Sequence, residues 1–268
     1  MPYDIPARIV RHQALNPDHF LMTLRAPAIA RAARPGQFVM LQVREGRDPL
    51  LRRPMSIYRR LPGGNLQVLY KVVGEGTGHL SRQRPGTLLK TLGPLGNGFR
   101  IAAATGGSAA PRPVMVAGGI GIAIFPFLAE RLARARRPLL LFGARRRRDL
   151  VARGFFRPRG IGVRVATEDG SAGLRGFVTQ LLEPILRDAN EGAKVELFVC
   201  GPTPMLRAVG ELARRSGAPC QLALESHMPC GIGVCLGCVV AGPADASGPT
   251  YRRVCTEGPI FEAAEVRP

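Results

Sequence analysis

The sequence has no tryptophan, and aromatic residues make up only 6% of its 268 residues. Surfaces that stack single-stranded bases interleave aromatic with basic side chains, so this composition argues against nucleic-acid binding. No segment reaches the run of about 18 apolar residues that a membrane-spanning helix needs. The first residues, MPYDIPARIVRHQ, lack the long apolar core of a signal peptide. We therefore expect a cytoplasmic protein with no membrane span and no nucleic-acid partner.

Lysine is also scarce. Among the 38 basic residues, the only lysines are Lys71, Lys90 and Lys194. The formal net charge is nevertheless +19. Such a surface attracts anions, such as nucleotides or an acidic partner, although the simpler interpretation is a solvated surface with no dedicated ligand. The four histidines have no ligand spacing, and no Ser/His/Asp set or carboxylate pair stands out. No catalytic acid–base residue is therefore assigned.

The order of patterns along the chain predicts three parts. Short β-rich runs bounded by glycine or proline, such as residues 36–43 and 65–73, predict an N-terminal antiparallel β-barrel domain at residues 1–106. A loop at residues 105–113 precedes alternating β and α segments, with strands at 114–117, 139–142, 162–166 and 195–200 and helices at 174–186 and 204–216. This alternation predicts a parallel-sheet, nucleotide-binding α/β domain at 107–220. A Cys/Gly-rich segment at 221–268 forms the third part.

The stretch CGIGVCLGC is the densest chemical signal in the chain. It places Cys230, Cys235 and Cys238 in a C-x4-C-x2-C spacing, and Cys255 follows after sixteen residues. This is the plant-type [2Fe–2S] pattern, in which each iron takes two thiolates. A zinc site is the alternative, but zinc sites more often use paired C-x2-C or Cys/His knuckles. Cys200 and Cys220 lie outside the spacing and are not expected to be ligands.

Five other motifs suggest phosphate or nucleotide binding, and each is weak alone. Arg53 in LLRRPMSIY could hold a pyrophosphate with Ser56, and the glycine-rich turn at 74–79 precedes a predicted helix. The sequence AGGIGIA follows a strand without completing G-x-G-x-x-G, and CGPTPML ends the last strand of the predicted sheet. The arginine run at 145–148 follows the second strand of that sheet. It could bind an adenosine phosphate, but it also fits a solvated charge run.

Taken in order, eight motifs resemble one family: LLRRPMSIY, YKVVGEGTG, LGPLGNGF, AGGIGIA, ATEDGS, CGPTPML, CGIGVCLGC and VCTEGPIF. The chain is similar, from about residue 5 to 265, to the iron–sulfur flavoprotein electron-transfer subunit of two-subunit, NAD-linked dihydroorotate dehydrogenase. That family lies in the ferredoxin-reductase-like superfamily. The resemblance implies an FAD-binding barrel, an NAD(P)-binding α/β domain and a small C-terminal [2Fe–2S] domain.

The resemblance also implies site residues. Those matching the FAD site are Arg53, Pro54, Met55, Ser56, Leu69, Tyr70, Lys71, Gly76 and Thr77. Those matching the nicotinamide side are Gly118, Gly119, Gly121, Cys200, Gly201 and Pro202. Those matching the cluster ligands are Cys230, Cys235, Cys238 and Cys255. The arginine run is not a feature that the family requires, so the choice between NAD and NADP stays open.

The implied function is electron transfer between a partner's FMN, which oxidises dihydroorotate to orotate in pyrimidine biosynthesis, and NAD. The path would use a [2Fe–2S] cluster and FAD, because a flavin joins one-electron to two-electron chemistry. The partner would be the FMN-containing catalytic subunit, in a hetero-oligomer such as a heterotetramer, and this chain would hold no dihydroorotate site. One alternative is a subunit of a sulfide dehydrogenase or a ferredoxin:NADP oxidoreductase-type complex. A distant alternative is a non-catalytic metal-binding interaction module.

Overall fold

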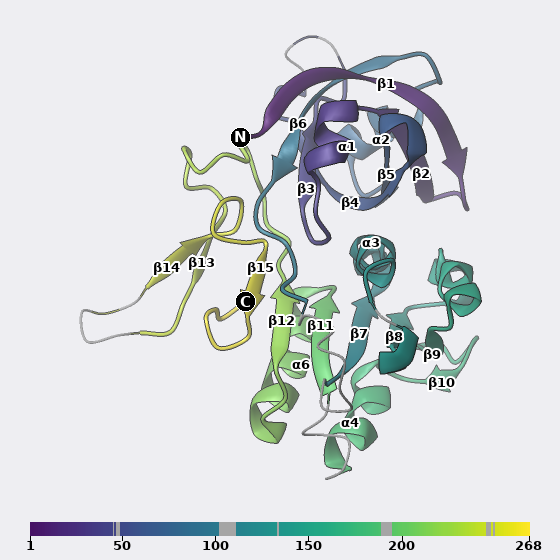
Figure 1. The fold of residues 1–268 in the computed structure, drawn as a ribbon, viewed down its shortest axis with the longest axis vertical. Coiled ribbons are helices and arrows are strands. Elements are labelled where there is room, and N and C mark those ends of the chain that lie inside the picture. Colours follow the sequence, from purple (N-terminus) through teal and green to yellow (C-terminus); the bar gives the residue numbers. More distant parts are fainter. Residues whose placement is uncertain are drawn as a thin grey trace.

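The fold comprises a barrel, an open sheet and a C-terminal segment that lies against both (Figure 1). The computed structural model describes residues 1–44, 46, 49–101, 111–132, 134–188, 195–244, 248 and 250–268. The predicted boundary between residues 106 and 107 lies outside these ranges. Among the described helices, none combines the length and apolar character needed to cross a bilayer.

The N-terminal part is a closed six-stranded barrel in which every neighbouring pair is antiparallel. Alternate residues point into it, because side chains of a strand alternate between its two faces. In β6, for example, Leu89 and Thr91 are buried, while Leu88 and Lys90 are exposed. In the order of the barrel, the strands are β1 (Tyr3–Ala14), β2 (His19–Arg25), β5 (Asn65–Lys71), β4 (Arg53–Leu61), β3 (Phe38–Leu41) and β6 (Leu88–Leu95). The predicted antiparallel barrel is confirmed.

The second part is a sheet whose strands are parallel except for the last. In spatial order, its strands are β10 (Leu174–Arg175), β9 (Gly162–Thr167), β8 (Leu139–Ala144), β7 (Arg112–Gly118), β11 (Val195–Cys200), β12 (Cys220–Ala223) and β15 (Ile260–Glu262). Every residue of β11 is buried, as expected for a parallel strand covered on both faces. The predicted parallel sheet is therefore confirmed.

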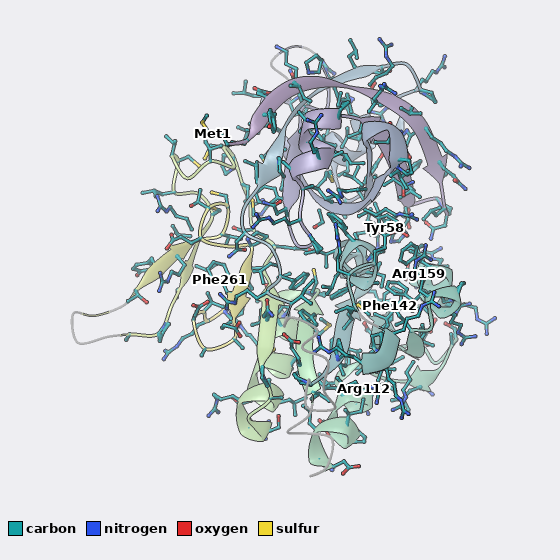
Figure 2. The ribbon with its side chains drawn as sticks, in the orientation of Figure 1. Met1, Tyr58, Arg112, Phe142, Arg159 and Phe261 are labelled. Carbon is teal, nitrogen blue, oxygen red and sulfur yellow. The ribbon has the colours of Figure 1, made fainter. Side chains whose placement is uncertain are left out.

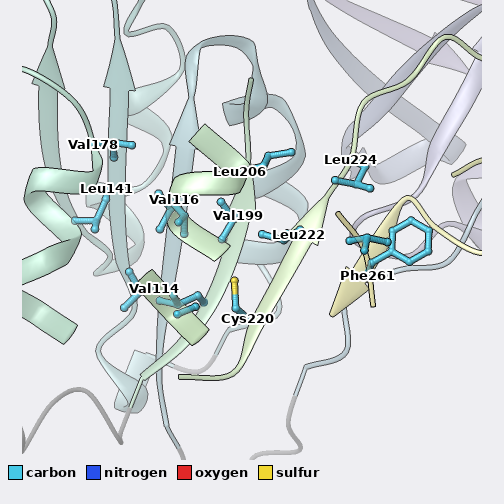
Figure 3. Close-up of a cluster of buried hydrophobic side chains, with 14 of the residues drawn as sticks. Val114, Val116, Leu141, Val178, Val199, Leu206, Cys220, Leu222, Leu224 and Phe261 are labelled. Carbon is cyan, nitrogen blue, oxygen red and sulfur yellow. The ribbon is translucent and has the colours of Figure 1, made fainter. Parts of the chain in front are cut away.

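Apolar side chains alternate between the two faces of this sheet. Val114 and Val116 point to the face covered by the longer helices, where Val178 and Leu206 belong to the same apolar cluster (Figure 3). Met115 and Ala117 point to the other face, among the residues that follow β7.

The helices are α1 (Pro27–Ala32), α2 (Glu75–Ser81), α3 (Phe125–Ala129), α4 (Thr179–Arg187) and α6 (Thr203–Ser216). The 3₁₀ turns are η1 (Pro62–Gly64), η2 (Gly119–Ile124), η3 (Arg134–Arg136), η4 (Arg147–Asp149), η5 (Arg153–Phe155) and η6 (Arg157–Arg159).

One predicted helix was wrong at its start. The expected helix at residues 174–186 begins instead as the edge strand β10, and α4 starts only at Thr179. Gly176 adopts a φ of 134°, a backbone conformation outside the right-handed helix. The helical spacing of apolar residues continues through Gly176, so this spacing alone did not indicate that the helix starts later.

The C-terminal segment returns to both other parts of the molecule. It forms the two-stranded sheet of β13 (Val239–Ala241) and β14 (Tyr251–Arg253), and then β15 pairs antiparallel with β12. The predicted division between residues 220 and 221 falls at the start of β12. The three-domain division remains a proposal.

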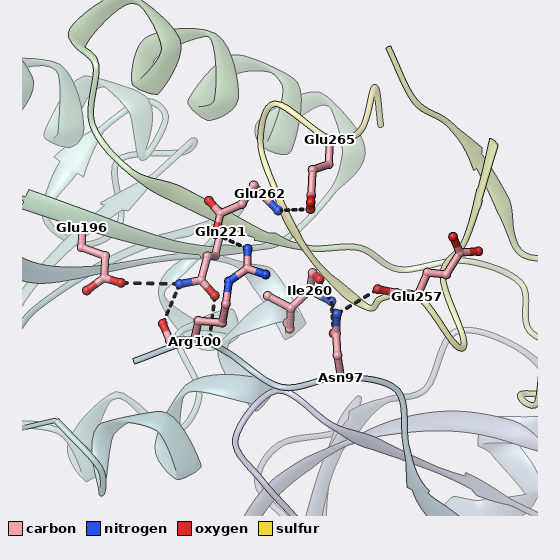
Figure 4. Close-up of polar contacts among 8 residues, drawn as sticks. All are labelled: Asn97, Arg100, Glu196, Gln221, Glu257, Ile260, Glu262 and Glu265. Atoms are coloured by element: carbon pink, nitrogen blue, oxygen red, sulfur yellow. Dashed lines mark hydrogen bonds and ion pairs between the residues drawn. The ribbon is translucent and has the colours of Figure 1, made fainter. Parts of the chain in front are cut away.

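Side-chain amides fasten this segment to the linker that leaves the barrel (Figure 4). The Gln221 side chain accepts a hydrogen bond from the Arg100 backbone N–H at 2.9 Å and donates one to the Arg100 carbonyl at 2.7 Å. Asn97 exchanges two hydrogen bonds with the backbone of Ile260, at 2.8 and 3.0 Å. Arg100 also forms an ion pair with Glu262. The linker, the sheet and the C-terminal segment are therefore held at one junction.

Replacement of Gln221 tests this junction. Gln221→Ala removes both bonds and strands a backbone N–H and C=O, which should cost about 2 to 3 kcal/mol. For a chain of this size that loss should lower the thermal unfolding midpoint by about 5 to 10 °C. Calorimetry would measure it, with Gln13→Ala, at an exposed position of β1, as the matched control. Equal midpoints for the two variants would contradict a structural role for Gln221.

Candidate functional site

The motif at residues 53–56 lies on β4, between β3 and β5. Met55 points into the barrel core, whereas Ser56 lies half-buried on the opposite face. Tyr58, two residues further on, packs with residues of η2 on that outer face. Figure 2 shows Tyr58 on the side of the barrel that faces the sheet, above Phe142. The outer face of β4 is thus turned toward the parallel-sheet part.

Arg53 lies directly on the backbone of Gly76, the second residue of α2. A Cβ atom at Gly76 would be 2.4 Å from Arg53 Nε, so only glycine leaves room for the guanidinium. Thr77 Oγ1 accepts hydrogen bonds from the N–H groups of Val73 and Gly74 at 2.9 and 3.2 Å, which fixes the turn. No ion pair to a carboxylate occupies Arg53 within the described residues. Its charge is therefore available to a phosphate.

The predicted β5 residues divide between the two faces of the strand. Leu69 packs with Tyr58 on the outer face, in the same apolar cluster as η2. Tyr70 points into the barrel, where its hydroxyl lies 2.9 Å from His12 Nε2 and its ring stacks on Phe20. Burial raises the pKa of Tyr70. Leu69, rather than the Tyr70 ring, therefore faces the sheet.

The two glycine loops of the nicotinamide side lie against each other at the carboxyl edge of the sheet. A Cβ at Gly121 would be 2.4 Å from the carbonyl oxygen of Cys200, and one at Gly201 would be 3.0 Å from Gly118 Cα. These contacts require backbone to pack on backbone. Gly119, with a φ of +53°, has no atom within 4 Å of its Cβ position and faces open space.

This edge is the point where the sheet reverses its strand order. From β7 the chain adds β8, β9 and β10 on one side, and then β11 and β12 on the other. Open α/β sheets bind ligands in the crevice outside such a switch point. The 3₁₀ turn η2 starts at Gly119 and packs against β4 and β5 of the barrel. The predicted flavin strand and the predicted nicotinamide loop are therefore neighbours.

Glu225 is a candidate site residue that the sequence did not indicate. It lies two residues beyond β12, whose Ala223 is paired with Cys200 in the neighbouring strand. Burial raises the pKa of the Cys200 thiol, and the negative charge of Glu225 raises it further. Partial burial of the carboxyl group raises the pKa of Glu225, and the residue as a whole is exposed. A carboxyl group with a raised pKa thus lies beside the predicted nicotinamide loop.

The four predicted cluster ligands lie on loops rich in left-handed backbone. Gly231 and Gly233 have φ values of 73° and 84°, which glycine adopts without strain. This backbone aims N–H groups at sulfur: Gly237 N–H donates to Cys235 Sγ at 3.4 Å, and Cys255 N–H donates to Cys238 Sγ at 3.4 Å. Such bonds favour thiolates and are typical of iron–sulfur sites.

The four thiols lie close enough to influence one another's pKa. Burial acts to raise the pKa of Cys230, but hydrogen bonds from backbone N–H groups and from the Cys235 thiol outweigh it and lower that pKa to about 6. Burial, together with a hydrogen bond to Cys238, raises the pKa of Cys255 to about 12. Within the described residues, no three Cys, His, Asp or Glu side chains are arranged to hold one metal ion. Four cysteine thiolates are the ligand set of a [2Fe–2S] cluster, and the C-x4-C-x2-C spacing favours that cluster over zinc.

The cysteine loop packs directly on the barrel beside the flavin strand. A Cβ at Gly231 would be 2.7 Å from Met40 Cγ in β3 and 3.3 Å from Leu95 in β6. Met40 is paired with Pro54 of the Arg-Pro-Met-Ser stretch in β4. Adjacent strands are about 4.8 Å apart, so a single strand separates the two predicted redox sites.

Solved ferredoxin reductases share this architecture. An NADH-dependent reduced ferredoxin-NADP oxidoreductase superposes with a TM-score of 0.83 at 28% identity, covering 100% of this chain and 91% of that chain. A ferredoxin NADP⁺ reductase from Neisseria gonorrhoeae superposes with a TM-score of 0.65 at 17% identity, covering 80% and 91%, and shows the fold alone. Fold and cysteine loop together define the class as a ferredoxin-reductase-like oxidoreductase with an added iron–sulfur segment.

Curated relatives identify the family within that class. The iron–sulfur cluster binding domain of dihydroorotate dehydrogenase B matches residues 225–267. The protein named dihydroorotate dehydrogenase B (NAD(+)), electron transfer subunit, from Desulforamulus reducens is 37% identical over 97% of each chain. Its counterpart from Geobacillus thermodenitrificans is 36% identical over 96% of each. The chain belongs to this family of electron transfer subunits, which confirms the predicted family and fold class.

Loss of one cysteine tests the cluster ligands. Cys235→Ala should abolish cluster assembly and leave bound FAD, because the exposed Cys235 loop lies outside the barrel core. Iron and acid-labile sulfide analysis, with FAD content from the absorption spectrum, would measure both. Cys220→Ala, at a sheet cysteine outside the motif, should keep the cluster. A full complement of iron in Cys235→Ala would disprove the assignment.

Addition of one methyl group at Gly76 tests the contact between Arg53 and α2. Gly76→Ala should push the guanidinium off α2 and weaken FAD binding about tenfold to hundredfold, the usual effect of losing a charge-assisted hydrogen bond. Fluorescence titration of the deflavinated protein with FAD would measure it. Gly78→Ala is the matched control on the same helix, because its Cβ would be 3.7 Å from the nearest atom. Equal FAD affinities for both variants would exclude this role.

Proposed function

We propose that this chain is the electron-transfer subunit that links an FMN-containing dihydroorotate dehydrogenase catalytic subunit to NAD(P). Family membership over nearly the whole length supports this function. The single observation that carries the mechanism is the position of the cysteine loop, which lies on Met40 of β3 next to β4. Bound FAD would exchange electron pairs with a nicotinamide and single electrons with a cluster.

The chain's own residues would bind, orient and separate the redox groups. Arg53, seated on Gly76, would hold the FAD pyrophosphate, and Ser56 with Leu69 would line the flavin on the outer face of the barrel. The open space above Gly119 would admit the nicotinamide half of the dinucleotide. The carboxyl group of Glu225, beside Cys200, would lie near that position, where its charge would affect the site. This chemistry needs no acid–base catalyst.

The four thiolates of the cysteine motif would hold a [2Fe–2S] cluster at the surface. Three large apolar side chains lie between these ligands in the sequence and are exposed. They are Ile232, Val234 and Leu236, with exposed fractions of 47%, 76% and 58%. Large exposed apolar side chains around a redox centre suit contact with a protein partner. We place the FMN-containing subunit on this side. The three-domain division and a cytoplasmic location, where thiols stay reduced for cluster assembly, complete the proposal.

A ferredoxin:NADP oxidoreductase-type complex is the second candidate. The similarity to the NADH-dependent reduced ferredoxin-NADP oxidoreductase, which covers 100% of this chain, supports it. The two candidates share the same sites in this chain and differ in the partner that docks near the cluster.

The deciding experiment combines spectroscopy with reconstitution. Under anaerobic conditions, NADH or NADPH should bleach the flavin and iron–sulfur absorption bands of the purified holoprotein. Addition of the FMN-containing catalytic chain from the same genome should then give dihydroorotate-dependent NAD(P)⁺ reduction, and the Cys235→Ala chain should not. Bleaching without dihydroorotate-dependent turnover would favour the second candidate. Failure of both nucleotides to bleach a protein that contains FAD and iron would overturn the proposal.

A further inference from the structure

A cleft of about 660 Å³ lies at the end of β4 that is remote from Arg53. Residues of β2, α1, β4 and η1 line its barrel side, and residues of α3 with the two positions after it line the other side. Helix α3 packs against β4, between the barrel and the sheet (Figure 1). Arg60, which lines the cleft, lies about 20 Å further along β4 than Arg53. Among the described residues that line the cleft, none is assigned above to FAD, the nicotinamide or the cluster.

Four arginines from separate segments converge on this cleft. They are Arg25, Arg31, Arg60 and Arg131. Arg25, Arg31 and Arg131 are exposed, and within the described part of the chain these three form no ion pair. The carboxylate that lines the cleft, that of Glu130, is already paired with Arg59 at 3.2 Å. Positive charges gathered in one cleft repel one another, and a bound anion relieves that repulsion.

The Arg60 side chain is held in position at the inner wall of the cleft. Its Nη1 atom donates hydrogen bonds to the carbonyl oxygens of Ala30 and Arg31, at 3.3 and 3.1 Å. Its guanidinium carbon lies 5.5 Å from the centre of the Phe127 ring. Within the described residues, Nε and Nη2 of Arg60 make no hydrogen bond. A guanidinium that is already positioned in this way loses little freedom when it binds a phosphate.

The wall beside the arginines is apolar and closely packed. Pro27, Leu61 and Pro62 line it together with the buried Phe127. A Cβ atom at Gly64, where φ is +73°, would be 2.8 Å from Pro27 Cβ, so glycine lets η1 pack directly on α1. Pockets of about 300 to 1,000 Å³ suit small organic ligands, and this cleft is of that size. The ligand that fits both walls carries several negative charges and an apolar ring system.

We propose that this cleft binds a nucleoside triphosphate, with its phosphates on the four arginines and its nucleoside against the apolar wall. A triphosphate carries about four negative charges near neutral pH, whereas a phosphate monoester carries about two. Four guanidinium groups, beside a Glu130 carboxylate that Arg59 already neutralises, match the larger charge. Guanidinium groups also donate paired hydrogen bonds to phosphate oxygens.

The bound anion bridges two parts of the molecule. Arg25, Arg31 and Arg60 belong to the barrel, whereas Arg131 follows α3. Helix α3 continues directly from η2, which carries the predicted nicotinamide loop. Binding therefore holds the barrel and this loop segment together, and it stabilises the folded chain in proportion to the occupancy of the cleft.

Calorimetric titration of the FAD-loaded protein with guanosine 5′-triphosphate tests the proposal. This probe lacks the adenine that FAD and the nicotinamide dinucleotides share, and a magnesium-free buffer of fixed ionic strength preserves its charge. Binding should be saturable and should raise the thermal unfolding midpoint. Guanosine 5′-monophosphate should bind about tenfold to hundredfold more weakly, because it leaves some of the arginines unpaired. Inorganic triphosphate should also bind more weakly, because it leaves the apolar wall uncovered.

Two double variants with the same loss of charge separate the cleft from the rest of the basic surface. Arg31→Gln/Arg131→Gln should weaken guanosine 5′-triphosphate binding about tenfold to hundredfold. Arg11→Gln/Arg84→Gln, at exposed barrel positions outside the cleft, should bind it as the parent does. The FAD content and the cluster absorption of both variants should equal those of the parent, which shows that they fold.

Three results would overturn the proposal. One is the absence of saturable binding, and another is equal weakening in the two double variants, which would show attraction to a generally basic surface. The third is equal affinity for guanosine 5′-triphosphate and inorganic triphosphate, which would leave an adventitious ion only. The function proposed above does not depend on this cleft, so NADH should bleach both double variants as it bleaches the parent.

Discussion

The relative positions of the barrel, the sheet and the C-terminal segment depend on one junction, where the Gln221 side chain is hydrogen-bonded to the linker that leaves the barrel. The Gln221 amide satisfies both backbone groups of Arg100, and Asn97 does the same for Ile260. Neutral amide pairs of this kind fix geometry, because a misplaced chain would leave buried polar groups without partners. Because β15 pairs with β12, the chain that leaves the sheet after β12 comes back to it, and between these strands it contacts the barrel. That return carries the cysteine loop onto Met40.

Close approach through glycine then determines the distances between the sites. Gly231 lets the cysteine loop touch β3, Gly76 lets Arg53 lie on α2, and Gly121 lets η2 touch the end of β11. A Cβ at any of these positions would collide with a neighbouring atom. The predicted flavin strand β4 therefore lies close to both the cysteine loop, which contacts β3, and the predicted nicotinamide loop, which packs against β4 and β5.

Charge has a local role in this structure as well as a global one. The net charge of +19 attracts any anion, and this general attraction gives no specificity. Contacts with other parts of the chain hold particular arginines in place, as at Arg53 on Gly76 and at the Arg147 turn bonded to Ser171. Elsewhere many arginines pair with nearby carboxylates, as Arg214 does with Glu211.

The sequence by itself determined the features that depend on local spacing or on one strand's pattern. The cysteine spacing, the β-rich first third and the alternating second third predicted the cluster motif and the fold class, because thiolate ligation and strand burial act over a few residues. The resemblance supplied the pairing of residues 53–56 with 76–77. Only the tertiary structure brought Glu225 to Cys200, placed Met40 under Gly231 and turned Tyr70 into the barrel. Those contacts arise from strand order and register between distant segments, and no local pattern encodes them.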